Sequence, residues 1–117
     1  MKFRYTYDSA FDLLDFSCDG EFKFKRSVKL DEGIYLDFDD GGRPIALEII
    51  GVSKIFRVLR KHLVEPYLEF HIEITSDLIR TEIKFHYLIN QQKRNVSIEN
   101  EVSNDYMLPP IEMTITN

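Results

Sequence analysis

The stretch GIYLDFDDGGRPIALEII, residues 33–50, decides the fold of this chain because it fits two incompatible structures. The part from Asp37 to Glu48 nearly matches the loop of a calcium-binding EF-hand, in which acidic side chains recur at fixed positions around a glycine. The whole stretch also alternates apolar and polar residues on either side of Gly41 and Gly42, as the two strands of a hairpin do. The first structure predicts a metal site, and the second predicts a tight turn.

The hairpin accounts for more of this stretch than the EF-hand does. Calcium takes roughly six to eight oxygen ligands, but Gly41 stands at the fifth loop position without a side chain, and Pro44 interrupts the loop. A two-residue turn at Gly41 and Gly42, both with positive φ, places the flanking residues on two faces. The apolar face pairs Phe38 with Ile45, Leu36 with Leu47 and Ile34 with Ile49, and the polar face carries Tyr35, Asp37, Asp39 and Glu48.

Alternation with period two continues through most of the chain, which predicts a β-rich α+β fold with an antiparallel sheet of about eight strands. Residues 53–63 break this pattern, because their apolar side chains recur at helical spacing. We therefore predict one amphipathic helix over 53–63, with Ser53 as its N-cap. Three basic residues fall in the expected last turn, where a helix favours cations: Arg60, Lys61 and His62.

Residues 64–117 predict an antiparallel meander of four strands. A turn at Ser76 and Asp77 sets opposite charges against each other on one face and apolar residues on the other. The expected pairs are Glu73–Arg80, His71–Glu82, Glu69–Lys84, Phe70–Ile83 and Leu68–Phe85. The next hairpin, looping through NQQKRN (residues 90–95), is expected to pair Lys84–Glu101, His86–Glu99, Tyr87–Ile98 and Ile89–Val96.

The composition is that of one globular domain. The 117 residues are 44% hydrophobic and 30% charged, which is enough to bury a core. No apolar run approaches the roughly 20 residues of a membrane helix, and the N-terminus lacks the apolar centre of a signal peptide. A lone cysteine, Cys18, excludes an internal disulfide and a multi-cysteine zinc site. We expect a cytoplasmic protein with one domain over 1–117, built from the strands and helix of 1–63 and the meander of 64–117.

The decisive hairpin also carries a family resemblance. GIYLDFDDGGRPIALEIIGVSK, residues 33–54, resembles the closing motif of a small, mainly prokaryotic family, domain of unknown function 2283. The shared positions are Leu36, Asp37, Phe38, Asp39, Gly42, Arg43, Glu48, Ile49 and Ser53. The opening motif of the family is similar to YDSAFDLLDF, residues 7–16, at Tyr7, Asp8, Asp12 and Leu14. Ala46 and Asp15 depart from the family pattern, which usually has a glycine and an aromatic residue there.

The resemblance covers about residues 1–55 and implies a shared fold for that part of the chain. The family has no established catalytic activity, so the resemblance implies no reaction. Genes for such domains often lie beside small toxin-like genes, which implies an antitoxin-like binding role for some members. The tail after Leu63 lies beyond the usual family domain.

The acidic residues of the hairpin give a candidate metal site. If Asp8 or Asp12 lies beside the polar face, the carboxylates of Asp37, Asp39 and Glu48 could bind calcium or magnesium together with it. The alternative is that Asp8 and Asp12 order their own turn through hydrogen bonds to the backbone, while the remaining carboxylates are solvated. We expect no other cofactor.

Catalytic chemistry is not indicated by the remaining reactive residues. His62, His71 and His86 are spread over a helix end and two strands, whereas a zinc or catalytic site needs converging side chains. Cys18 has no His, Lys or Arg beside it in the sequence to activate its thiol. We therefore expect a protein that is not an enzyme.

A candidate interaction surface is formed by Tyr35 with the basic residues Lys54, Arg57, Arg60 and Lys61. The net charge of −5 and the absence of a recognition motif argue against nucleic-acid binding. We expect a small non-enzymatic binding or structural protein that engages a protein partner, and a homodimer formed through a sheet edge. The alternative function is divalent-cation binding by the acidic face of the hairpin.

Overall fold

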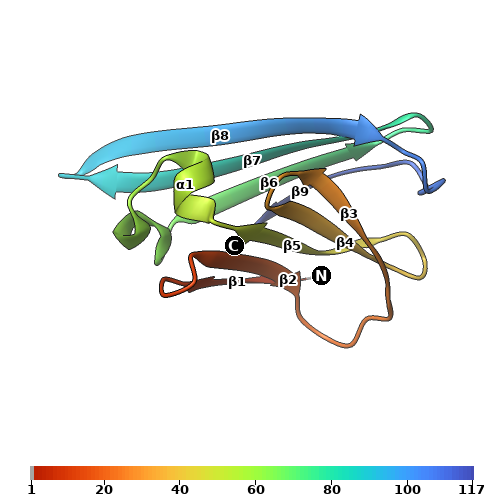
Figure 1. The fold of residues 1–117 in the computed structure, drawn as a ribbon, viewed down its shortest axis with the longest axis horizontal. Helices are drawn as coiled ribbons and strands as arrows, with labels where there is room; N and C mark the ends of the chain where they lie inside the picture. Colours follow the sequence, from red (N-terminus) through yellow and green to blue (C-terminus); the bar gives the residue numbers. More distant parts are fainter. Residues whose placement is uncertain (1) are drawn as a thin grey trace. The chain divides into compact units, whose positions relative to one another are not determined.

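The computed structural model describes residues 2–117, and over these residues it contains nine strands in two antiparallel sheets (Figure 1). The prediction of a β-rich, antiparallel fold with one helix is confirmed, with nine strands where about eight were expected. The chain divides into two compact units, of which the first ends at Val64 and the second runs from Glu65 to Asn117. Each unit has its own sheet, and the single domain expected for 1–117 stays a prediction. No helix within residues 2–117 is long and apolar enough to cross a membrane.

The first unit contains a five-stranded sheet with the strand order β1-β2-β5-β4-β3. Its strands are β1 (Phe3–Asp8), β2 (Leu13–Cys18), β3 (Phe24–Asp31), β4 (Ile34–Asp39) and β5 (Pro44–Ile50). Because successive side chains of a strand point to opposite faces, one face is apolar and buried. Its most deeply buried side chains are Leu14, Phe16, Ile34, Leu36, Phe38, Leu47 and Ile49. The intervening residues make an outer, polar face.

The β4–β5 hairpin confirms that residues 33–50 are a turn between strands, but the turn is longer than predicted. Ile34 pairs with Ile49 and Leu36 with Leu47 as expected, whereas Phe38 pairs with Pro44 after a register shift. The expected pair Phe38–Ile45 is therefore wrong. The physical reason is the side chain of Asp39, which accepts hydrogen bonds from the main-chain N–H groups of residues 41 and 43.

The turn itself has three residues, 40–42, closed by a hydrogen bond from the Asp39 N–H to the Arg43 carbonyl at 2.9 Å. Gly42 has a φ of 81°, and Gly41 is not among the positive-φ residues. A three-residue loop that ends on a left-handed glycine is a common hairpin connection. The prediction that both glycines have positive φ is therefore wrong, and Gly42 alone needs that freedom.

The segment after β5 differs most from its prediction. The expected helix over 53–63 is in fact α1 (Val52–Phe56), followed by a separate 3-10 turn, η1 (Arg60–Leu63). The helix ends at Arg57, whose φ of 56° is left-handed and changes the direction of the chain. Val58 is consequently buried, whereas Leu59 is 65% exposed. The predicted N-cap is also wrong, since Gly51 occupies that position and Ser53 lies inside the helix.

The second unit is a four-stranded sheet with the strand order β8-β7-β6-β9. Its strands are β6 (Tyr67–Ile74), β7 (Leu78–Ile89), β8 (Gln92–Ser103) and β9 (Ile111–Thr116). All five pairs predicted for the first hairpin are present in the β6–β7 register: Leu68–Phe85, Glu69–Lys84, Phe70–Ile83, His71–Glu82 and Glu73–Arg80. The pairing within this hairpin is therefore as predicted, but the four-strand meander is wrong, because β9 pairs with β6 and not with β8.

The register predicted for the β7–β8 hairpin is wrong. The turn is only Asn90 and Gln91, with φ values of 50° and 64°, which is the conformation of a tight two-residue hairpin turn. Four of the residues expected in a six-residue loop, 92–95, instead begin β8, so that every pair shifts. The observed pairs are Lys84–Ser97, His86–Asn95, Tyr87–Arg94 and Ile89–Gln92.

Candidate functional site

The outer face of the five-stranded sheet gathers three carboxylates from three strands. Glu48 on β5 is paired with Asp15 on β2 and with Tyr35 on β4. A hydrogen bond to Asp37, burial, and the nearby charges of Asp37 and Asp15 raise the pKa of Glu48 to about 7. Burial and the charge of Asp37 also raise the pKa of Asp15, against a hydrogen bond from Ser17 that lowers it. We name Asp15, Asp37 and Glu48 the acidic cluster, and within it the carboxyl of Glu48 takes up a proton near neutral pH.

Asp39 does not contribute to the acidic cluster, although the sequence suggested that it would lie with Asp37 and Glu48. Its Oδ1 accepts hydrogen bonds from the N–H groups of Gly41 at 3.0 Å and Arg43 at 2.8 Å, and the residue is buried in the turn. Its carboxylate is thus a turn-forming group. Within residues 2–117, no group of three or more His, Cys, Asp or Glu side chains is placed to hold a metal ion.

Replacing Glu48 by glutamine is expected to stabilise the protein by about 1 kcal/mol at pH 8, after allowance for solvent screening of a half-exposed group. The pKa of Glu48 is raised from its ordinary 4.5 to about 7, so the folded chain binds this proton more tightly than the unfolded chain. Ionised Glu48 therefore lowers the free energy of unfolding, and this destabilisation is absent below pH 4.5 and complete above pH 7. Glutamine resembles the protonated acid and can still donate to Asp37.

The measurement is urea unfolding of both proteins at pH 5 and pH 8. The stability of the wild type relative to Glu48→Gln should fall as the pH rises. Glu21→Gln, in an exposed loop, is the control and should follow the wild type. An identical pH dependence for wild type and Glu48→Gln contradicts the raised pKa of Glu48.

Asp12 connects the two motifs that are far apart in the sequence. Its carboxylate accepts hydrogen bonds from the Ser53 hydroxyl at 2.6 Å, the Ser53 N–H at 3.1 Å and the Tyr7 hydroxyl at 2.7 Å. Its main-chain carbonyl accepts from the N–H groups of Gly51 and Val52. Asp12 therefore satisfies the free N–H groups at the start of α1, the role that a capping side chain usually fills from within the helix.

The electrostatics of this junction keep Asp12 ionised. Burial acts to raise the pKa of Asp12, but the hydrogen bonds from Ser53 and Tyr7 and the charge of Arg60 together lower it below its usual value. Burial and the hydrogen bond to Asp12 raise the pKa of Tyr7 to about 12. The Tyr7 hydroxyl thus remains a proton donor to a carboxylate throughout the physiological range.

The turn between β1 and β2 presents an exposed aromatic ring on a main chain that hydrogen bonds hold in place. Asp8 Oδ1 accepts hydrogen bonds from the N–H groups of Ala10 at 3.0 Å and Phe11 at 3.2 Å. With Asp12 anchored to α1, both ends of the turn are fixed, yet the side chain of Phe11 is 77% exposed. The alternative suggested for Asp8 and Asp12, ordering of their own turn, describes the side chain of Asp8, whereas the carboxylate of Asp12 bonds to Tyr7 and to Ser53.

Two further apolar side chains lie at this end of the outer face. Leu13 and Ile50 are directly paired between β2 and β5, and they are 37% and 55% exposed. Arg60 Nη1 donates to the Ser9 carbonyl at 2.6 Å, which fixes a positive charge beside the turn. We name the three apolar side chains Phe11, Leu13 and Ile50 the Phe11 surface.

The predicted interaction residues are only partly brought together. Tyr35 lies on β4 beside the acidic cluster, Lys54 is on α1, Arg57 ends that helix, and Arg60 and Lys61 are in η1. All four basic side chains are exposed. Of the five predicted residues, Arg60 is the one that a hydrogen bond ties to the Phe11 surface, through Ser9.

The remaining reactive residues do not converge on the surfaces described so far. The histidines lie on η1, β6 and β7, and His86 Nε2 is 3.6 Å from Glu69 Oε2. Burial, as the largest of several effects, raises the pKa of the Cys18 thiol, which disfavours its reactive thiolate.

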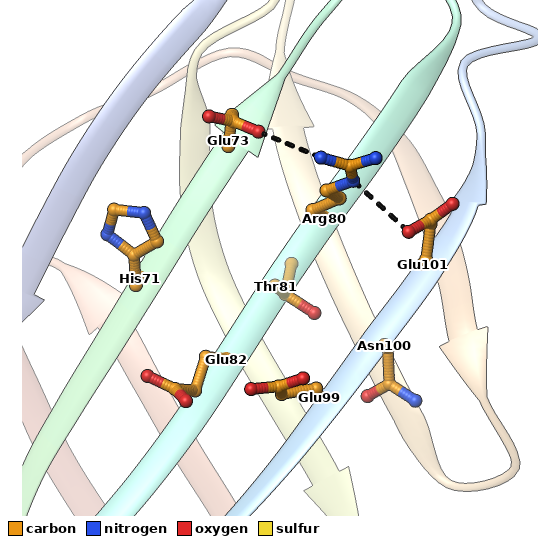
Figure 2. A pocket seen from close by; sticks show the side chains of 8 residues that line it. All are labelled: His71, Glu73, Arg80, Thr81, Glu82, Glu99, Asn100 and Glu101. Carbon is orange, nitrogen blue, oxygen red and sulfur yellow. Dashed lines mark hydrogen bonds and ion pairs between the residues drawn. The ribbon is translucent and has the colours of Figure 1, made fainter.

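The polar face of the second unit has a shallow hollow of about 460 Å³ over β6, β7 and β8. Its lining residues are His71, Glu73, Arg80, Thr81, Glu82, Glu99, Asn100 and Glu101. Figure 2 shows Arg80 between two glutamates, with its Nη1 3.6 Å from Glu73 Oε1 and its Nε 3.1 Å from Glu101 Oε2. Glu82 and Glu99 stand directly opposite each other, a like-charge pair that is unfavourable across strands. The hollow therefore carries excess negative charge.

The sequence reasoning missed the contact between Asp12 and Ser53, and it missed Asp15 as the third member of the acidic cluster. A signal for the first was present, because Tyr7, Asp12 and Ser53 are all positions shared with the family motifs. Asp15 gave no such signal, since the family usually has an aromatic residue there.

The chain is similar to a known protein family and to a known relative. A family described as "Protein of unknown function (DUF2283)" matches residues 4–53, which begin in β1 and end at Ser53 in α1. "Uncharacterized protein MJ0789" of Methanocaldococcus jannaschii is 36% identical over 95 residues, covering 80% of this chain and 79% of that protein. An alignment of 95 residues is longer than the first unit, so it extends into the second. No solved structure matches the chain. This chain therefore belongs to the DUF2283 family.

Proposed function

We propose that this chain is a non-catalytic protein-binding module and that the Phe11 surface is where its first unit engages a partner. The carrying observation is that Phe11 is 77% exposed although both ends of its turn are fixed by hydrogen bonds. A turn whose backbone is already fixed loses less conformational entropy on binding than a mobile loop, and aromatic residues are enriched in interface centres. The pairing of Leu13 with Ile50 extends the apolar area beside it.

The charges around this surface indicate the chemistry of the partner. Arg60 is fixed at the turn by its bond to Ser9, and Lys54 and Arg57 are exposed on and after α1. A partner segment with apolar side chains and carboxylates fits such a surface, because opposite charges at the rim favour correct encounter. The raised pKa of the Cys18 thiol and the separate positions of the histidines support a role in binding over one in catalysis. A cytoplasmic location, where a lone thiol stays reduced, remains our prediction.

The test is affinity capture from the native cell extract with the double variant Phe11→Ser/Ile50→Thr. Loss of two central apolar contacts is expected to weaken partner binding at least about thirtyfold, measured by titration with the purified partner. Leu88→Ser is the matched control, because Leu88 is 63% exposed but lies on β7. Equal binding by the double variant and the wild type, with both folded by circular dichroism, contradicts the proposal.

A further inference from the structure

The sheet edges differ in how well they are protected against pairing with another chain. Natural edge strands are kept short, bulged or interrupted by proline. Among residues 2–117, β1 has six residues, β9 has six and follows Pro109 and Pro110, and β3 has two register shifts against β4. By contrast, β8 has twelve residues, no proline and an unbroken register with β7. The edge of β8 is therefore the one that none of these devices protects.

The hydrogen-bonding groups of β8 point outward at regular positions. In a hairpin with a two-residue turn the closing pair is hydrogen-bonded, and such pairs recur at every second residue. Here the closing pair is Ile89–Gln92, so the even-numbered residues of β8 bond to β7. Asn104, the even-numbered residue just after β8, agrees with this pattern, because its N–H donates to the Asp77 carbonyl at 2.8 Å. The odd-numbered residues from Lys93 to Glu101 thus present their N–H and C=O groups to the free edge.

The sequence of β8 is complementary to itself about Ser97. When two copies run antiparallel with Ser97 opposite Ser97, Lys93 faces Glu101, Asn95 faces Glu99, and Val96 faces Ile98. Each side chain stays on its own face of the sheet, because all pairs join residues of the same parity. A shift of the centre to Val96 still pairs Lys93 with Glu99 but sets the charged Arg94 against the apolar Ile98, and a shift to Ile98 leaves no oppositely charged pair. Of these three registers, the one centred on Ser97 alone combines opposite-charge and apolar pairs without setting a charged side chain against an apolar one.

This pairing also offsets part of the excess negative charge of the hollow in Figure 2. Within one chain Glu99 stands opposite Glu82, and Glu101 shares Arg80 with Glu73. A second copy brings its Asn95 beside Glu99 and its Lys93 beside Glu101. Opposite charges and amide–carboxylate pairs across strands are stabilising, whereas the like-charge pair alone is not.

We infer that two copies of this chain pair through β8 in an antiparallel, two-fold symmetric arrangement centred on Ser97. The pairing joins the two four-stranded sheets edge to edge. Five hydrogen-bonded pairs from Lys93 to Glu101 give about ten main-chain hydrogen bonds. The half-exposed side chains of Val96 and Ile98 gain a cross-strand apolar neighbour. This dimer uses the second unit and does not depend on the Phe11 surface.

A charge-exchange experiment tests both the edge and the register. Lys93→Glu places two like-charge pairs in the dimer, and Glu101→Lys does the same. The dimer dissociation constant of each variant alone, measured by sedimentation equilibrium, should therefore be at least about ten times that of the wild type. An equimolar mixture of the two variants restores both opposite-charge pairs and should recover the wild-type affinity. Lys25→Glu, the same charge change on β3, should leave the dimer unaffected.

A disulfide tests the position of the two-fold axis. In a Cys18→Ser background, Ser97→Cys places two thiols on a hydrogen-bonded pair whose Cα atoms are about 5.5 Å apart, within disulfide range. Oxidation should give a covalent dimer, whereas Ser103→Cys on the same strand should not. The inference is overturned if the wild type is monomeric at a protein concentration of about 10⁻⁴ M. It is also overturned if Lys93→Glu leaves the dimer affinity unchanged, or if the two cysteine variants cross-link equally.

Discussion

Replacing Asp12 by alanine is expected to lower the free energy of unfolding by about 3–5 kcal/mol. The carboxylate is 3% exposed and accepts hydrogen bonds from Tyr7 and from both the hydroxyl and the N–H of Ser53. Alanine leaves these partly buried donors without their acceptor, and a buried donor without a partner costs about 1–3 kcal/mol. Asp12 also has a φ of 54°, a conformation that aspartate tolerates better than alanine.

Two further variants separate the contributions of Asp12. Asp12→Asn keeps the shape and the tolerance for positive φ, but turns one oxygen into a donor that faces other donors, so we expect about half the loss. Asp8→Ala removes only the exposed bonds to Ala10 and Phe11 and should cost about 1 kcal/mol. Urea unfolding at pH 7 measures all three. A loss for Asp12→Ala no larger than that for Asp8→Ala contradicts the importance of the junction.

The pH dependence of Asp12→Ala gives an independent check. The pKa of Asp12 is lowered in the folded chain, so its stabilising effect is complete above the unfolded value of 3.8 and is lost as the pH falls through the folded pKa. The difference between wild type and variant should therefore be constant from pH 7 to about pH 5 and should shrink in strong acid.

Gly33→Ala is expected to destabilise the protein by about 2–4 kcal/mol. Gly33 has a φ of 78°, and an added Cβ would lie 2.6 Å from the carbonyl oxygen of Ile50 and 3.0 Å from Ile55 Cδ1. That approach is close because the Ile50 N–H donates to the Gly33 carbonyl at 2.8 Å. The clash is with backbone, so relief requires β4 and β5 to separate at that point.

Gly51 provides the matched control for Gly33. Its φ is 76°, nearly the same, but an added Cβ would meet nothing within 4 Å. Gly51→Ala should therefore cost only the backbone strain, about 1 kcal/mol. Thermal and urea unfolding of both variants measure the difference. If the two substitutions cost the same, the close approach to Ile50 is not what requires glycine at position 33.

The sequence predicted strands and their pairing well where alternate residues had one clear partner. The β6–β7 hairpin was found in register because charge pairs and apolar pairs both required the same turn at Ser76 and Asp77. The β7–β8 register was wrong because a polar stretch, NQQKRN, was taken for loop. Such residues continue a strand when an Asn in the left-handed conformation closes a two-residue turn.

The candidate site could be predicted only in part, for a physical reason. Asp37 and Glu48 were placed together by strand alternation, which is local. Asp39 was misassigned because its side chain bonds to backbone N–H groups two and four residues ahead, and alternation carries no information about such bonds. The helix prediction failed at Arg57, whose positive φ results from burying Val58, a tertiary requirement that periodicity does not contain.

The bond from the Tyr5 hydroxyl to the Leu63 carbonyl, 2.5 Å long, has a consequence for how the chain is made. It joins β1 to η1 across 58 residues, and the Asp12–Ser53 junction spans 41. On the ribosome, where domains tend to fold in order of synthesis, β1 and β2 emerge long before their partners do. The first unit therefore cannot complete its folding until residue 63 has left the exit tunnel, by which time translation has already begun on the strands that follow.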